Sequence, residues 1–135
     1  MNRKDFRILV LDDEPDWRRA NEKTLARAGF AVRTASTGAE ALKMLAAEKF
    51  QMAVLDINLP DCDGAELAGK VRRLSPATVV IMLTGFATIE KASVAAAGGS
   101  SDILEKIADD PDDKPLSEEL VERAEEISAS VAGGG

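Results

Sequence analysis

The stretch FRILVLDDEPDWRRANEKTLARAGF, residues 6–30, joins a short apolar run to an amphipathic segment through an acidic turn. The continuous run at 6–11 is typical of a strand that is buried on both faces of a sheet. From Pro15 to Ala28 apolar residues recur at helical spacing, and Gly29 provides a signal for the end of a helix. This stretch therefore predicts one strand followed by one helix.

The same order of strand and helix recurs along the rest of the chain. Further strand-like runs are FAVRTA (30–35), MAVLD (52–56), TVVIML (78–83) and the short stretch 101–104. Helix-like stretches follow these runs at 37–50, 63–74, 87–97 and 116–128. Alternating strands and helices form parallel sheets through right-handed crossovers. We therefore expect a doubly wound α/β domain with a five-stranded parallel sheet and helices on both faces.

Composition and charge set the broad class of the protein. The chain has 135 residues, of which 45% are hydrophobic and 30% are charged, and this suits one folded domain. We expect that domain to cover residues 1–131, and residues 132–135 to be a flexible glycine-rich tail or the start of a linker. The formal net charge of -7 disfavours direct contact with nucleic acid or an anionic membrane.

The cysteine and histidine contents narrow the chemistry. Cys62 is the only cysteine, which excludes an internal disulfide and suits a reducing compartment. We expect neither a signal peptide nor a membrane span, and hence a cytoplasmic protein. The sequence contains no histidine, which excludes a Ser-His-Asp triad and a histidine general base. Carboxylates must therefore carry the chemistry.

Acidic residues lie where two of the predicted strands end. Asp12 and Asp13 follow the first strand, and Asp56 closes the third. In doubly wound folds ligands bind at the carboxyl ends of the strands, so we expect these side chains to meet there. Clustered carboxylates repel one another unless a cation compensates, and Mg²⁺ suits an open cluster because it keeps several waters and binds phosphate oxygens. The sequence therefore predicts a magnesium site.

Two more polar residues fall at the same predicted edge. Thr84 follows the fourth strand and Lys106 follows the fifth. A carboxylate can act as a nucleophile towards a phosphoryl group while a metal and an ammonium group neutralise the phosphoryl oxygens. Taken alone, Asp13 is equally suited to cap the helix that begins near Pro15. Only the whole set of residues predicts phosphoryl transfer.

Four linked motifs resemble those of the response-regulator receiver family, and the resemblance runs from Arg7 to about Ser128. The motifs are VLDDEPDWRR (10–19), VLDINLPDCDGAEL (54–67), LTGFAT (83–88) and DILEK (102–106). The separations between Asp56, Thr84 and Lys106 are also similar to those of the family. The resemblance implies a flavodoxin-like (βα)5 three-layer sandwich with strand order 2-1-3-4-5.

The resemblance also implies a role for each acidic residue. Asp56 would accept the phosphoryl group, and the protein would be a signalling domain rather than an enzyme that acts on other molecules. Asp12, Asp13 and Asp56 would hold Mg²⁺ together with the main-chain carbonyl of Asn58.

The remaining site residues and the partners follow from the same resemblance. Thr84 would bind a phosphoryl oxygen, and Lys106 would pair first with the Asp56 carboxylate and then with the phosphoryl group. The donor would be a sensor histidine kinase or a phosphotransfer protein. The output would be a downstream protein, an output domain beyond this chain, or a homodimer formed on phosphorylation.

Two positions depart from the family pattern. Ile103 stands where the family usually has an aromatic residue, and Ile107 stands where proline usually follows the lysine. Lys114-Pro115 is a competing match to that Lys-Pro pair, although the spacing favours Lys106. These two departures favour one alternative, a receiver-like interaction module that is never phosphorylated. A second alternative, an acidic-site Mg²⁺-dependent phosphatase, also stays open.

Overall fold

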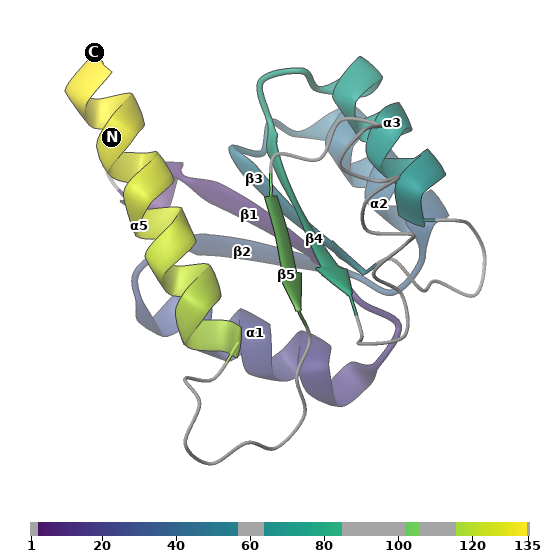
Figure 1. The fold of residues 1–135 in the computed structure, drawn as a ribbon, viewed down its shortest axis with the longest axis horizontal. Helices are drawn as coiled ribbons and strands as arrows, with labels where there is room; N and C mark the ends of the chain where they lie inside the picture. The colour runs from purple at the N-terminus through teal and green to yellow at the C-terminus, as the bar shows by residue number, and fades with distance from the viewer. Residues whose placement is uncertain (1–2, 57–63, 85–101, 106–115, 135) are drawn as a thin grey trace.

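The computed structural model describes residues 3–56, 64–84, 102–105 and 116–134. Its centre is a sheet of five parallel strands in the order β2-β1-β3-β4-β5 (Figure 1). The strands are β1 (Arg7–Leu11), β2 (Ala31–Ala35), β3 (Met52–Asp56), β4 (Val79–Thr84) and β5 (Asp102–Glu105). The predicted strand order and parallel direction are confirmed.

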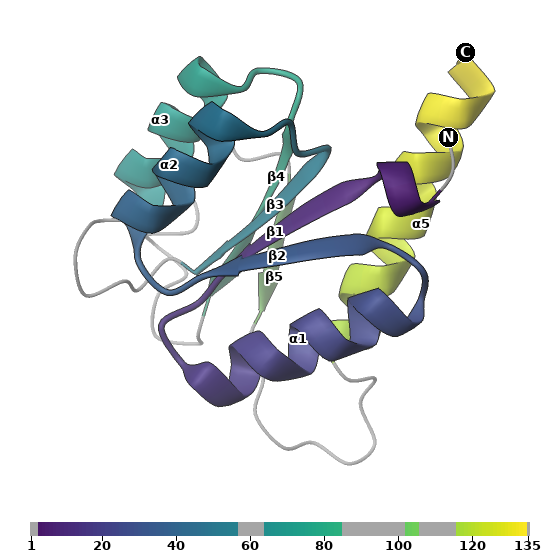
Figure 2. The same ribbon diagram turned by 180° about the vertical axis from the view of Figure 1, so that it is seen from behind.

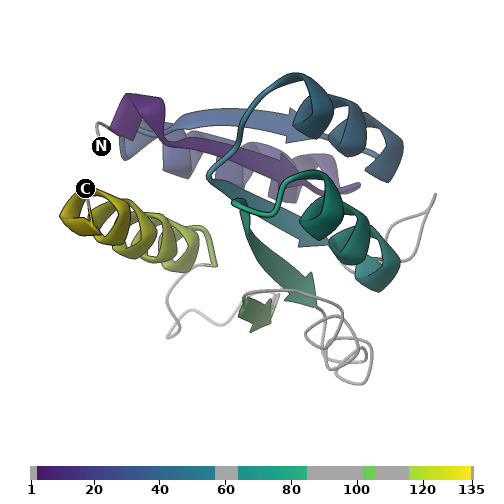
Figure 3. The ribbon, with the colours of Figure 1, turned by 90° about the horizontal axis from the view of Figure 1, so that it is seen from above.

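Helices cover both faces of this sheet. A short 3-10 turn, η1 (Arg3–Asp5), precedes the described α-helices α1 (Pro15–Arg27), α2 (Gly38–Ala47), α3 (Gly64–Leu74) and α5 (Leu116–Gly134). Figures 1 and 2 show α1 and α5 on one face and α2 and α3 on the other, and Figure 3 shows the three layers from above. The predicted three-layer sandwich is confirmed. The helix predicted at 87–97 lies outside the described residues.

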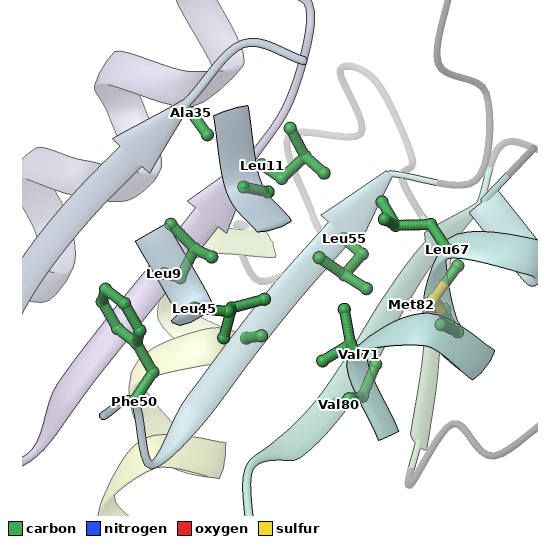
Figure 4. Close-up of a cluster of buried hydrophobic side chains, with 13 residues drawn as sticks. Leu9, Leu11, Ala35, Leu45, Phe50, Leu55, Leu67, Val71, Val80 and Met82 are labelled. Atoms are coloured by element: carbon green, nitrogen blue, oxygen red, sulfur yellow. The ribbon is translucent and has the colours of Figure 1, made fainter. Parts of the chain in front are cut away.

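The continuous apolar runs become strands that are buried on both sides, because successive side chains of a strand point to opposite faces. In β1, Leu9 and Leu11 pack with the side chains of α2 and α3, whereas Ile8 and Val10 pack with those of α1 and α5. Figure 4 shows the first of these two cores, in which Leu45 of α2 lies over the sheet. The sheet is therefore packed on both faces, with one core against α2 and α3 and the other against α1 and α5.

Helix α1 begins and ends close to the predicted positions. Pro15 occupies the start of the helix, where its missing N–H removes no helical hydrogen bond. Gly29 follows the end with φ of 99°, in the left-handed region that glycine adopts without a steric penalty. The N–H of Gly29 donates to the carbonyl of Ala26 at 3.0 Å. The predicted stop at Gly29 is therefore confirmed.

Thr37 caps the N-terminus of α2, and its replacement by alanine tests the cap. The Thr37 hydroxyl accepts a hydrogen bond from the N–H of Glu40 at 3.2 Å. We expect Thr37→Ala to lower the free energy of unfolding by about 1 kcal/mol, because an N–H at the helix start loses its partner. Urea denaturation measures the change. Thr37→Ser keeps the oxygen and should stay close to wild type, and equal loss in both variants would contradict a capping role.

Helix α5 is longer than the sequence predicted. It continues to Gly134, whereas the amphipathic pattern indicated an end near Ser128. An established helix extends easily because each added residue gains a hydrogen bond without a new nucleation step. The segment after Ser128 contains alanine and no proline, so it permits this extension. Within the described ranges, no helix combines the length and apolar character needed to cross a lipid bilayer.

Candidate functional site

The register between β1 and β3 brings two of the predicted site residues together. Leu11, the last residue of β1, pairs with Leu55. Asp12 and Asp56 are the residues that follow this pair in the two strands. Their backbones therefore lie next to each other at the carboxyl edge of the sheet, where ligands bind in doubly wound folds.

The next two pairings extend this edge to β4 and β5. Asp56 pairs with Leu83, and Thr84 pairs with Glu105. Thr84 closes β4 one residue beyond the partner of Asp56, so its backbone lies at the same edge as Asp56. Lys106 follows Glu105 directly in the sequence. Four parallel strands thus end together around the predicted site.

Some parts of the predicted site lie outside the described residues. These parts are the whole of Asn58 and Lys106, together with the side chains of Asp56 and Thr84. Ile107 and the competing Lys114-Pro115 pair also lie outside the described residues.

Asp12 is a buried carboxylate that is anchored on several sides. Its exposed fraction is 0%. Its N–H donates to the carbonyl of Ala35 in β2 at 3.2 Å, and its Oδ1 accepts from the N–H of Glu14 at 2.9 Å. Nη1 of Arg18 donates to the Asp12 carbonyl at 2.9 Å. Burial of a charged group is costly unless polar partners compensate, and these bonds fix both the main chain and the side chain of Asp12.

Asp12, Asp13 and Glu14 form an acidic cluster, whose carboxylate oxygens lie within 4.8 Å of one another. Asp13 and Glu14 are exposed, so the cluster opens to solvent beside the buried carboxylate. An all-oxygen set of this kind is what a hard divalent cation binds. The sequence indicated Asp12 and Asp13, but Glu14 was missed, although a third acidic residue directly after the pair was a visible signal.

The alternative role of Asp13 as a helix cap is not supported. The N-cap position of α1 belongs to Glu14, and the side chain of that residue makes no capping hydrogen bond. Asp13 therefore lies before the cap position and carries its carboxylate in the cluster.

Sequence comparisons identify a family that matches most of the chain. The response regulator receiver domain family matches residues 8–120. The response regulator protein PilR of Pseudomonas aeruginosa is 36% identical over 103 residues, which are 76% of this chain and 23% of PilR. The response regulator receiver protein CpdR of Brucella abortus is 37% identical over 83 residues, which are 62% of this chain and 69% of CpdR. The chain spans about a quarter of the length of PilR and of GlrR of Escherichia coli.

Solved structures give the same result. A CheY-like response regulator receiver domain protein from Methanospirillum hungatei has a TM-score of 0.78 and 32% identity, with 93% of this chain and 98% of that chain covered. A response regulator from Burkholderia pseudomallei, solved with a phosphorylated aspartic acid, a calcium ion and citrate, has a TM-score of 0.76 and 31% identity. The match covers 97% of this chain and 75% of that chain. The chain therefore belongs to the response regulator receiver domain family.

Proposed function

We propose that this receiver domain accepts a phosphoryl group on Asp56 from a sensor histidine kinase or a phosphotransfer protein, in a reaction that depends on Mg²⁺. The observation that carries this proposal is the strand register. The pairing of Leu11 with Leu55 and of Asp56 with Leu83 supports a site in which Asp12, Asp56 and Thr84 share one edge. The phosphorylated aspartic acid of the Burkholderia pseudomallei relative agrees with a carboxylate as acceptor.

The residues present fit a magnesium ion. Asp12, Asp13 and Asp56 would hold it with the main-chain carbonyl of Asn58, and Glu14 would add negative charge beside it. This donor set contains only oxygen, as Mg²⁺ requires, and the exposed side of the cluster leaves room for the ion's waters. When bound, the ion neutralises charge on the phosphoryl oxygens and orients the group.

The residues of this chain then carry the transfer. A carboxylate oxygen of Asp56 forms a bond to phosphorus as the phosphorus–nitrogen bond of the donor's phosphohistidine breaks, and the released imidazole nitrogen takes a proton. The Thr84 hydroxyl donates to a phosphoryl oxygen, and the Lys106 ammonium group neutralises another. Hydrolysis by water later restores the Asp56 carboxylate and releases inorganic phosphate.

We assign the receiver domain to residues 1–131 and place the protein in the cytoplasm. The proposed output of phosphorylation is a change in a protein-interaction surface of this domain. Phosphorylation is a local change of charge that shifts an equilibrium between two conformations. A beryllofluoride-activated NtrC4 receiver domain, solved as a dimer, has a TM-score of 0.75 and 31% identity to this chain. Homodimerisation is therefore one proposed output. The other is a changed contact with a partner protein or with an output domain beyond this chain. Light scattering with and without a phosphoryl mimic distinguishes them.

Intact-protein mass spectrometry tests the proposed function. The chain is incubated with acetyl phosphate and Mg²⁺, and a parallel sample contains EDTA in place of Mg²⁺. We expect one phosphoryl adduct that forms only with Mg²⁺. Binding of Mg²⁺ without an adduct from either acetyl phosphate or a phosphorylated kinase would favour the interaction module that is never phosphorylated. Turnover of small phosphate esters would favour the phosphatase.

A further inference from the structure

Arg18 links the first turn of α1 to the main chain of the acidic cluster. Its main-chain N–H donates to the carbonyl of Glu14 at 3.0 Å, which is the first hydrogen bond of the helix. Its side chain turns back, and Nη1 donates to the carbonyl of Asp12 at 2.9 Å in a partly buried position. One residue of the helix therefore holds both ends of the segment from Asp12 to Glu14.

This link completes a short closed set of hydrogen bonds around the turn. The N–H of Glu14 donates to Oδ1 of Asp12, so the carboxylate is tied to the same turn that Arg18 holds through the Asp12 carbonyl. On the other side, the N–H of Asp12 donates to Ala35 of β2. The turn is thus fixed both to the sheet and to α1. Arg18 supplies two of these hydrogen bonds from α1, one through its main-chain N–H and one through its side chain.

We propose that Arg18 is a positioning residue for divalent-cation binding at the acidic cluster. By holding the Asp12 carbonyl, it keeps the carboxylates of Asp12, Asp13 and Glu14 close together, and the affinity for the cation rises as a result. This inference rests on the proposed role of the cluster in binding Mg²⁺. Groups that orient metal ligands from outside the coordination shell strongly influence metal affinity.

The charge of Arg18 makes the proposal easy to distinguish from a simple electrostatic effect. A guanidinium group near a cation site repels the cation, so its removal should by itself strengthen Mg²⁺ binding. Loss of the anchor for the turn should weaken Mg²⁺ binding. The two effects have opposite signs, and the direction of the change in affinity therefore identifies the dominant one.

Calorimetric titration of the full chain with Mg²⁺ provides the main test, with Arg18→Met compared to wild type. We expect the dissociation constant to rise by about tenfold, the lower end of the range for residues that orient metal ligands. Arg19→Met is the matched control, because Arg19 is the exposed neighbour on the same helix and carries the same charge. The control should bind Mg²⁺ as wild type does or slightly more tightly. Arg18→Lys should recover most of the lost affinity, because an ammonium group can also donate to the Asp12 carbonyl.

Amide hydrogen exchange supplies a second readout that needs no metal. In Arg18→Met the N–H of Glu14 should lose protection, because its acceptor Asp12 is less well held, while the N–H of Ala41 in α2 should keep its protection. If Arg18→Met does not fold, Arg18→Lys and Arg18→Gln replace it in both measurements. Glutamine keeps a shorter donor, so we expect the lysine variant to bind Mg²⁺ more tightly than the glutamine variant.

Specific results would overturn the inference. A dissociation constant in Arg18→Met equal to or lower than that of Arg19→Met, with wild type binding Mg²⁺, would remove Arg18 from this role and leave the proposed function intact. Equal affinities in the lysine and glutamine variants would do the same. Failure of wild type itself to bind Mg²⁺ would overturn both the inference and the metal site of the proposed function.

Discussion

Asp56→Asn is expected to take up no phosphoryl group under conditions in which wild type is fully labelled. Asparagine has nearly the size of aspartate, but its amide oxygen lacks the charge that makes a carboxylate a nucleophile. Asp56 pairs with Leu83 through the main chain of β3 and β4, and asparagine preserves that pairing. The variant should therefore fold. Intact-protein mass spectrometry with acetyl phosphate and Mg²⁺ measures the loss, and circular dichroism checks the fold.

A second aspartate variant serves as the matched control for this experiment. Asp16 is exposed in the first turn of α1, so Asp16→Asn makes the same chemical change near the acidic cluster but outside it. We expect Asp16→Asn to be labelled as completely as wild type. Full labelling of Asp56→Asn would show that another residue accepts the phosphoryl group, and peptide mapping of that adduct would identify it.

The sheet could be predicted because its sequence signal is local. Continuous apolar runs such as 6–11 and 52–56 have to be buried on both faces, and a parallel sheet between helices satisfies that need. The expected place of the candidate site came from the same reasoning, and Asp12 and Asp56 do stand directly after the paired strand residues Leu11 and Leu55. A pattern that combines strand ends with acidic residues therefore predicts the edge where ligands bind, before any contact is known.

The contacts of the site could not be predicted, because they join segments that the sequence does not connect. The N–H of Asp12 donates to the carbonyl of Ala35 in β2, and the carbonyl of Asp12 accepts from Nη1 of Arg18. In the sequence, Arg18 is one of two adjacent arginines in an amphipathic helix, and no feature of the sequence distinguishes it from its exposed neighbour Arg19. The end of α5 was missed for a different reason, because glycine lowers helix propensity without forbidding the helix.

Asn21 is a polar residue on the buried face of α1. It lies four residues from both Trp17 and Leu25, which pack into the core between the sheet, α1 and α5. Its exposed fraction is 0%. Neither Nδ2 nor Oδ1 has a hydrogen-bond partner among the described residues. Leaving a buried polar group of this kind unpaired costs about 1–3 kcal/mol of folding stability.

Asn21→Leu is therefore expected to raise the free energy of unfolding by about 1–3 kcal/mol, since leucine has the same number and branching of side-chain heavy atoms and needs no hydrogen-bond partner. Urea denaturation should show a higher midpoint with an unchanged slope, because the surface exposed on unfolding is nearly the same. Asn21→Ala is the matched control. It also removes the amide but leaves unfilled space, so its stability should fall below that of the leucine variant.

The stability of Asn21→Leu, together with its rate of phosphorylation, also shows whether the buried amide of Asn21 contributes to phosphoryl transfer. Lower stability of Asn21→Leu than of wild type would contradict this account, and would mean either that the amide has a partner in solution, such as a buried water, or that the larger leucine side chain is not accommodated. If the leucine variant is more stable and takes up the phosphoryl group at the wild-type rate, the amide costs stability without serving the transfer. A slower transfer in the stabilised variant would indicate that α1, which carries Arg18 in its first turn, has to move during the reaction.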